Sequence, residues 1–174
     1  MTDARLPASF EELAMPLFSQ LYNFAHWLTQ DRSKAEDLVQ ETYVKALRGF
    51  GGFQPGTNFR AWMYRILRNT FLTSRTSSKA GATVALEEEE EDQIATTVET
   101  PESIFLANAQ REAVQNALAA LPVPFREILL LCDYEEMSYQ EISDTLGIPM
   151  GTVMSRLSRA RRALRLGLSK KVGG

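Results

Sequence analysis

The chain has 174 residues, of which 19 are Lys or Arg, 22 are Asp or Glu and 44% are hydrophobic, which predicts one or two small globular domains. Its single cysteine, Cys132, and single histidine, His26, exclude an internal disulfide framework, a cysteine zinc cluster and a multi-histidine metal site. We therefore expect no metal and no cofactor, and a reducing, cytoplasmic location. The N-terminus lacks a basic segment followed by an apolar one, so we predict no signal peptide. The sequence lacks an apolar run of about 20 residues, so we predict no membrane insertion.

The formal net charge of -3 is distributed unevenly along the chain. Residues 80–103 carry eight acidic side chains and no basic one, whereas residues 145–174 carry seven basic side chains and no acidic one. A basic segment of this kind is typical of a protein that binds a polyanion. A solvated helix end explains the same charges equally well, because cations also stabilise the C-terminus of a helix.

The first part of the chain has apolar residues three or four positions apart, which predicts helices. Two of these helices begin with the pattern of a capping box, a serine followed three residues later by a glutamate: Ser9 with Glu12, and Ser33 with Glu36. The run 49–56 is rich in glycine and contains a proline, so it ends the second helix. Thr57 or Asn58 then caps a third helix, and the first domain is predicted to end near residue 75.

A linker is predicted over residues 76–100, because this segment has little to bury and contains six consecutive acids, 87–92. Like charges repel and favour an extended, flexible chain. Thr100 and Pro101 fit the N-cap and the first residue of the helix that opens a second domain, 101–174.

The second domain is also predicted to be helical. Pro122 and Pro124 separate its first helix from a second one, at about residues 125–133. Ser138 and Glu141 form a third capping box, whose short helix ends at Gly147, and Pro149 sets the first turn of a last helix at about residues 150–166. Apolar and polar residues do not alternate with period two in any part of the sequence, so we predict no strands. The predicted fold is therefore all-α, with two small domains joined by a flexible acidic linker.

The two short helices joined by residues 146–149 have the form of a helix-turn-helix, whose second helix enters the major groove of DNA. One face of that helix is predicted to pack on the helix before it, with Val153, Leu157, Ala160 and Leu164. The remaining positions carry arginine and small polar side chains that suit phosphates and base edges. The candidate DNA-reading residues are Thr152, Met154, Ser155, Arg156, Ser158, Arg159 and Arg162.

Residues 139–161, together with Leu121-Pro122 and Arg126, resemble region 4 of extracytoplasmic-function sigma factors, which are subunits of bacterial RNA polymerase. In the first domain, AEDLVQETY at residues 35–43 resembles the helix of this family that binds the polymerase clamp, and FRAWMYRILRN at residues 59–69 resembles its promoter-melting helix. These motifs cover nearly the whole chain. Two positions depart from the pattern: Ser143 stands where alanine is usual, and Met154 stands where lysine or arginine is frequent, which bears on promoter preference.

The resemblance implies a sigma factor that binds core RNA polymerase at the β′ clamp and the β flap, with an anti-sigma factor as a further partner. Residues 1–75 would form region 2, and residues 101–174 would form region 4, which reads the -35 promoter element. The implied clamp contacts are Asp37, Gln40 and Glu41. The implied residues for recognition and melting of the -10 element are Arg60, Tyr64, Arg65, Arg68, Asn69 and the loop from Gly49 to Asn58.

Simpler interpretations stand beside these roles. The acidic residues near Asp37 also fit a solvated helix face, and the aromatic residues Phe59 and Trp62 fit core packing. The acidic block 87–92 fits either a mimic of nucleic-acid phosphate or a solubilising spacer.

Two rival functions are a stand-alone helix-turn-helix regulator and an enzyme that depends on Cys132. The enzyme is disfavoured because Cys132 and His26 lie in different predicted domains, with no third catalytic group marked by a motif. We therefore predict that the chain is not an enzyme.

Overall fold

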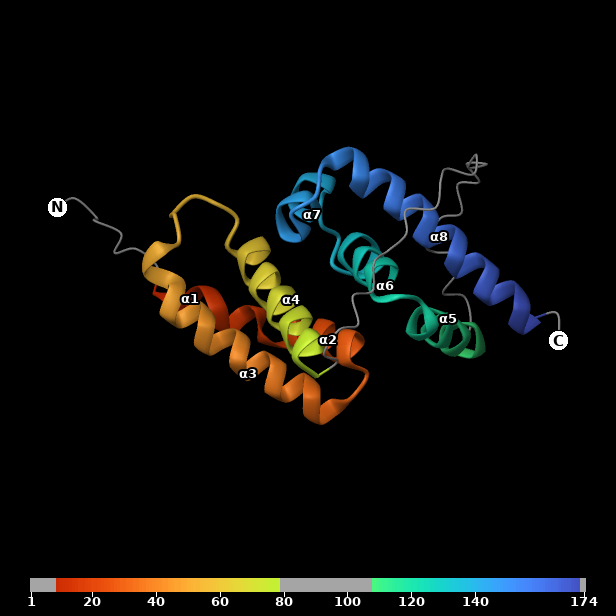
Figure 1. Ribbon diagram of the computed structural model, residues 1–174, viewed down its shortest axis with the longest axis horizontal. Helices are drawn as coiled ribbons and strands as arrows, with labels where there is room; N and C mark the ends of the chain where they lie inside the picture. The colour runs from red at the N-terminus through yellow and green to blue at the C-terminus, as the bar shows by residue number, and fades with distance from the viewer. Residues whose placement is uncertain (1–8, 79–107, 173–174) are drawn as a thin grey trace.

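The computed structural model describes residues 9–78 and 108–172, and every regular element within these ranges is helical. Figure 1 shows the helices in two groups, which confirms the all-α fold of two small domains. The first domain contains α1 (Phe10–Ala14), α2 (Phe18–Thr29), α3 (Arg32–Gly49) and α4 (Phe59–Ser78). The second contains α5 (Asn108–Ala120), α6 (Val123–Leu129), α7 (Tyr139–Leu146) and α8 (Met150–Val172).

Short elements complete the two domains. The single-turn 3₁₀ helices η1 (Met15–Leu17) and η2 (Phe50–Gly52) lie before α2 and after α3, and the π-helical turn η4 (Leu130–Tyr134) follows α6. The acidic block 87–92 and the helix start at Thr100 and Pro101 lie outside the described residues, as does most of the linker predicted over 76–100. None of the helices in the described ranges is both long enough and apolar enough to cross a membrane.

The helix starts of the first domain follow local hydrogen bonding. Ser9 and Asn58 cap α1 and α4, because their side-chain oxygens accept hydrogen bonds from amides three residues later, at 3.3 Å and 3.0 Å. The predicted capping by Ser33 is wrong. Asp31 has the extended backbone of an N-cap and accepts a hydrogen bond from the amide of Lys34 at 3.1 Å, so α3 begins before Ser33, which lies within its first turn.

In the second domain the reciprocal capping box of Ser138 and Glu141 is confirmed, with hydrogen bonds of 3.1 Å and 3.3 Å. The helix predicted at about residues 125–133 begins earlier, at Val123, and becomes the π turn η4 after Leu129. The last helix continues to Val172, because no proline interrupts the residues that follow 166.

The apolar cores of the two domains join in one cluster of buried side chains. The helices α2, α3 and α4 pack on one another in the first domain, and α5, α6 and α7 pack against α8 in the second. Burying each large apolar side chain contributes about 1.5–3 kcal/mol, so these contacts hold the short helices in place. The largest fully buried side chains include Leu21, Met63 and Leu67 in the first domain and Ile128, Leu131, Ile142 and Leu157 in the second.

The two domains also contact each other. The side of α4 that faces the second domain packs against α7, and α2 contacts α6 (Figure 1). The candidate residues of α4 therefore lie beside this boundary.

Candidate nucleic-acid interface

The turn between α7 and α8 is held by three hydrogen bonds on Ser143, one of them from the amide of Ile148 to the Ser143 carbonyl oxygen at 3.3 Å. Gly147 ends α7 with a left-handed φ of +67°, and its amide donates to the carbonyl oxygen of Ser143 at 2.9 Å. The hydroxyl of Ser143 donates to the carbonyl oxygen of Ile148 at 2.6 Å. From the sequence alone, Ser143 is only a departure from the family pattern. In the structure its hydrogen bonds stabilise the turn that positions α8.

The faces of α8 are arranged as predicted. Its apolar positions are buried against the rest of the second domain, and the helix runs along the side of that domain away from α1–α4 (Figure 1). The predicted reading residues lie at least partly at the surface, with Met154 54% exposed and Arg162 exposed. Half-buried positions make up the rest of this reading face: Thr152, Ser155, Arg156, Ser158 and Arg159. The reading face thus offers arginine, hydroxyl groups and one flexible apolar side chain.

Tyr64 does not present an exposed ring in this conformation, contrary to a simple stacking role. Its side chain is 0% exposed, and its ring meets that of Phe24 edge-on with the centroids 5.1 Å apart. Burial and the negative charge of Glu135 raise the pKa of Tyr64, so its hydroxyl stays neutral. The ring therefore belongs to the core of the first domain.

The candidate cations of α4 fall into two groups. Arg60 and Arg68 form ion pairs with carboxylates of the second domain, and their side chains are only partly exposed. Arg65 and Asn69 are exposed at the surface of the same helix. In this conformation the structure thus leaves only part of the predicted melting face accessible.

The loop from Gly49 to Asn58 is anchored by aromatic packing. The ring of Phe53 lies 5.3 Å from that of Phe59 and 5.1 Å from that of Trp62, between centroids. Phe50 stacks on Phe53 at 6.0 Å. These contacts support the packing role of Phe59 and Trp62, and they fix the loop directly at the N-terminal end of α4.

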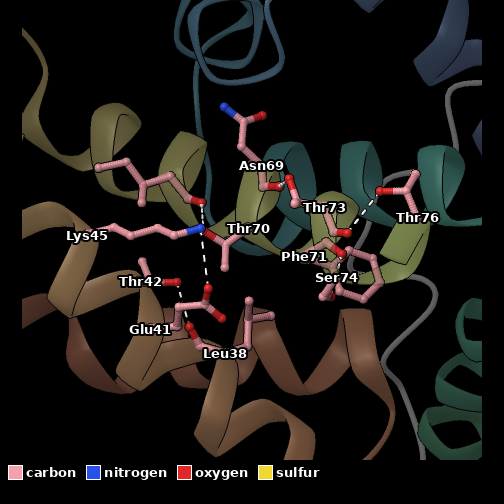
Figure 2. A network of polar contacts seen from close by, with 11 residues as sticks. Leu38, Glu41, Thr42, Lys45, Asn69, Thr70, Phe71, Thr73, Ser74 and Thr76 are labelled. Atoms are coloured by element: carbon pink, nitrogen blue, oxygen red, sulfur yellow. Dashed lines mark hydrogen bonds and ion pairs between the residues drawn. The ribbon is translucent and has the colours of Figure 1, made fainter. Parts of the chain in front are cut away.

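A second surface lies on α3, where Asp37, Gln40 and Glu41 are all exposed. Figure 2 shows the ammonium group of Lys45 between Glu41 and the hydroxyl of Thr70, at 3.4 Å and 3.3 Å. The Glu41 carboxylate is therefore oriented by its neighbour while it remains open to a partner.

Two apolar residues extend this α3 surface and were not predicted to belong to it, since the sequence places Leu47 among the periodic apolar positions of the helix. Val44 and Leu47 are 47% and 61% exposed and lie three and six residues after Glu41 on the same helix. The helical period alone identifies them weakly, because Leu47 follows the buried Ala46 directly. An exposed acidic and apolar surface favours a protein partner over nucleic acid.

A groove of about 560 Å³ borders the α3 surface. It lies between the two domains, and its lining includes Asp37 and Glu41 from α3, Phe71 and Arg75 from α4 and Val123 from α6. The groove thus continues the α3 surface into the boundary between the domains.

Cys132 has none of the features of an activated nucleophile. Burial, followed by the nearby charge of Asp133, raises the pKa of its thiol, although the guanidinium of Arg161 lies 3.7 Å from the sulfur atom. Across residues 9–78 and 108–172 there is no cluster of three His, Cys, Asp or Glu side chains arranged to hold a metal ion.

Comparison with known protein families assigns both domains. Residues 13–80 match sigma-70 region 2, and residues 111–164 match sigma-70 region 4. The ECF RNA polymerase sigma factor SigE of Mycolicibacterium smegmatis is 36% identical over 162 residues, which are 93% of this chain and 62% of that relative. The RNA polymerase sigma factor YlaC of Bacillus subtilis is 31% identical over 163 residues, which are 93% of each chain.

A solved structure agrees with this assignment. The sigma factor RpoE of Bartonella quintana, solved in complex with the anti-sigma factor NepR, superposes with a TM-score of 0.68 at 29% identity, over 92% of this chain and 96% of that one. Along this chain sigma-70 region 2 precedes region 4, and the helix-turn-helix lies in region 4. The chain belongs to the extracytoplasmic-function family of RNA polymerase sigma factors.

Proposed function

We propose that this protein joins core RNA polymerase and directs it to promoters that carry a -35 and a -10 element. One observation carries the proposal: the second helix of the helix-turn-helix, in the domain that matches sigma-70 region 4, carries arginine and hydroxyl side chains at its surface. Arginine donates a fork of hydrogen bonds to guanine, and serine or threonine bonds either partner of a base pair. The helix α8 would therefore read the -35 element as duplex DNA.

The first domain would act on the -10 element. Arg65 and Asn69 are already at the surface of α4, and the aromatic-anchored loop 49–58 lies at the start of the same helix. Cations along a groove track the backbone of a separated strand, and a base taken out of the stack needs a pocket to hold it. Arg60 and Arg68 would join this surface when the second domain moves away from α4.

The α3 surface would bind the polymerase. Its exposed acids, Asp37 and Glu41, fit a basic surface of the β′ clamp, and the neighbouring Val44 and Leu47 add apolar area. The second domain would contact the β flap. The protein would act in the cytoplasm beside the polymerase, which performs the chemistry of RNA synthesis.

An anti-sigma factor is the third proposed partner. The groove beside α3 offers such a partner both domains at once. The Bartonella sigma factor that this chain resembles was solved with an anti-sigma factor bound.

Capture of core polymerase followed by promoter-specific run-off transcription tests the proposed function. The wild-type protein should bind core enzyme and give transcripts of defined length, while Asp37→Asn/Glu41→Gln should capture less core enzyme. Glu11→Gln/Glu12→Gln, which removes two exposed acids of α1, is the charge-matched control and should behave as wild type. A protein that binds DNA without core enzyme and confers no initiation on it would be a stand-alone regulator instead.

A further inference from the structure

Carboxylates of the second domain cover one face of α4. The Nε of Arg68 lies 2.9 Å from a carboxylate oxygen of Glu127, and their side chains are 17% and 1% exposed. A guanidinium nitrogen of Arg60 lies 3.1 Å from the carboxylate of Glu135, whose side chain is 5% exposed, and also donates to the backbone oxygen of that residue. Both pairs join the first domain to the second.

A third contact extends this row to the start of α4. The side-chain amide of Asn58 donates to Glu141 at 2.9 Å, although Glu141 also closes the capping box of α7. The positions 58, 60 and 68 thus follow α4 over most of the promoter-melting motif. Tyr64, which lies between the two arginines along the helix, is buried.

Arg126 anchors the same closed arrangement at the far end of the boundary. It is buried and donates to the carbonyl oxygens of Trp27 at 2.9 Å and Leu28 at 3.3 Å, at the end of α2. It also bonds carbonyls at the end of α5, and the side chain of Gln30 donates to one of them, that of Ala119, at 2.8 Å. The cation therefore satisfies the negative ends of one helix from each domain.

A carboxylate and a DNA phosphate are the same kind of partner for a guanidinium group, since both accept its paired N–H donors. While Glu127 holds Arg68 and Glu135 holds Arg60, neither arginine is available to a nucleic-acid backbone. We propose that the second domain inhibits the first by contacting it. Glu127 stays paired with Arg68, and Glu135 with Arg60, until the two domains separate. This inference rests on the proposed role of α4 at the -10 element.

The closed arrangement is suited to reversible opening. Burial raises the pKa of Glu127, because the carboxylate has lost its water. The nearby charge of Arg68 offsets only part of this rise. The Nε of Arg60 is buried without a hydrogen bond within the described residues. Water reaches all of these groups when the domains separate, which offsets part of the lost ion pairing.

Neutralising the two carboxylates in the full chain tests the inference. Glu127→Gln/Glu135→Gln is compared with Glu112→Gln/Asp133→Asn, a control that changes net charge equally. Glu112 is exposed on α5, and Asp133 pairs with Arg161 inside the second domain. Small-angle X-ray scattering measures the radius of gyration, and fluorescence anisotropy measures affinity for a labelled single-stranded oligonucleotide without polymerase.

The variant should have a larger radius of gyration and at least about tenfold tighter binding to the oligonucleotide, while the control should match the wild type. An unchanged radius and affinity would overturn the inference, and so would expansion without tighter binding. Glu135→Gln alone is the milder variant if circular dichroism shows that the double variant loses helix. Run-off transcription with the wild-type protein tests the proposed function separately, because that measurement uses neither substitution.

Discussion

Replacing Arg126 by methionine is expected to destabilise the protein strongly, because this one side chain bonds the ends of two helices. Its guanidinium donates five hydrogen bonds of 2.9–3.3 Å, all to backbone carbonyl oxygens. Three of the acceptors, at Leu118, Ala119 and Leu121, belong to the second domain, and the other two belong to the end of α2 in the first.

The magnitude follows from what the substitution leaves behind. A hydrogen bond to a charged group contributes about 1.5–3 kcal/mol, but water replaces part of this at carbonyls that become accessible. Each buried carbonyl oxygen left without a donor costs about 1–3 kcal/mol, and since water reaches some of the five, we expect Arg126→Met to lower the free energy of unfolding by about 3–5 kcal/mol. Arg126→Lys keeps the charge but has only three donors on a single nitrogen, so about half of that loss is expected.

Urea denaturation followed by far-UV circular dichroism measures both variants against the wild type. Tryptophan fluorescence gives a second probe, since the carbonyl of Trp27 accepts one of the five bonds. A free energy of unfolding for Arg126→Met within about 1 kcal/mol of the wild-type value would refute the reasoning, because the carbonyls would then be satisfied without the guanidinium.

Three further predictions concern the helix-turn-helix. Arg159→Ala should weaken discrimination at one -35 base by about 1–3 kcal/mol in a randomised promoter library, whereas an equal loss on every sequence would indicate a phosphate contact. Ser143→Ala removes the hydroxyl that donates to Ile148 and should cost about 1 kcal/mol of unfolding free energy, and an unchanged urea midpoint would contradict this role. A hydrogen bond from Asn58 holds the pKa of Glu141 below its ordinary 4.5, so its stabilising contribution is complete above that pH and is lost as the pH falls through the lowered pKa. The Glu141→Gln variant should therefore lose less stability than the wild type when the pH is lowered, as followed by circular dichroism. An equal loss of stability in the variant and the wild type would count against the contact.

The helix-turn-helix was predictable because its signals are local. A serine and a glutamate three residues apart close the capping box, a glycine takes the left-handed conformation at Gly147, and apolar residues recur at the helical period along α8. Each of these features depends on neighbours within about one or two turns. Where two local signals competed, as with Asp31 and Ser33 before α3, the pattern alone selected the wrong cap.

The apposition of the two domains was not predictable from local pattern. Arg68 and Glu127 are 59 positions apart in sequence, and Arg60 and Glu135 are 75 apart. In sequence these residues look like ordinary surface charges, and the spacing of Tyr64 between two arginines looks like an exposed stripe. Only the structure shows that Glu127 and Glu135 of the second domain pair with the two arginines, and that Tyr64 is buried against Phe24 of the first domain.

Transcription from a library of random upstream sequences tests the central claim most directly. Purified bacterial core polymerase is mixed with this protein, and the 5′ ends of the transcripts are sequenced together with their templates. The proposed function predicts initiation at templates enriched for two short elements at a fixed separation, near -35 and -10. Initiation no greater than with core enzyme alone, or enrichment of a single element bound without polymerase, would contradict it.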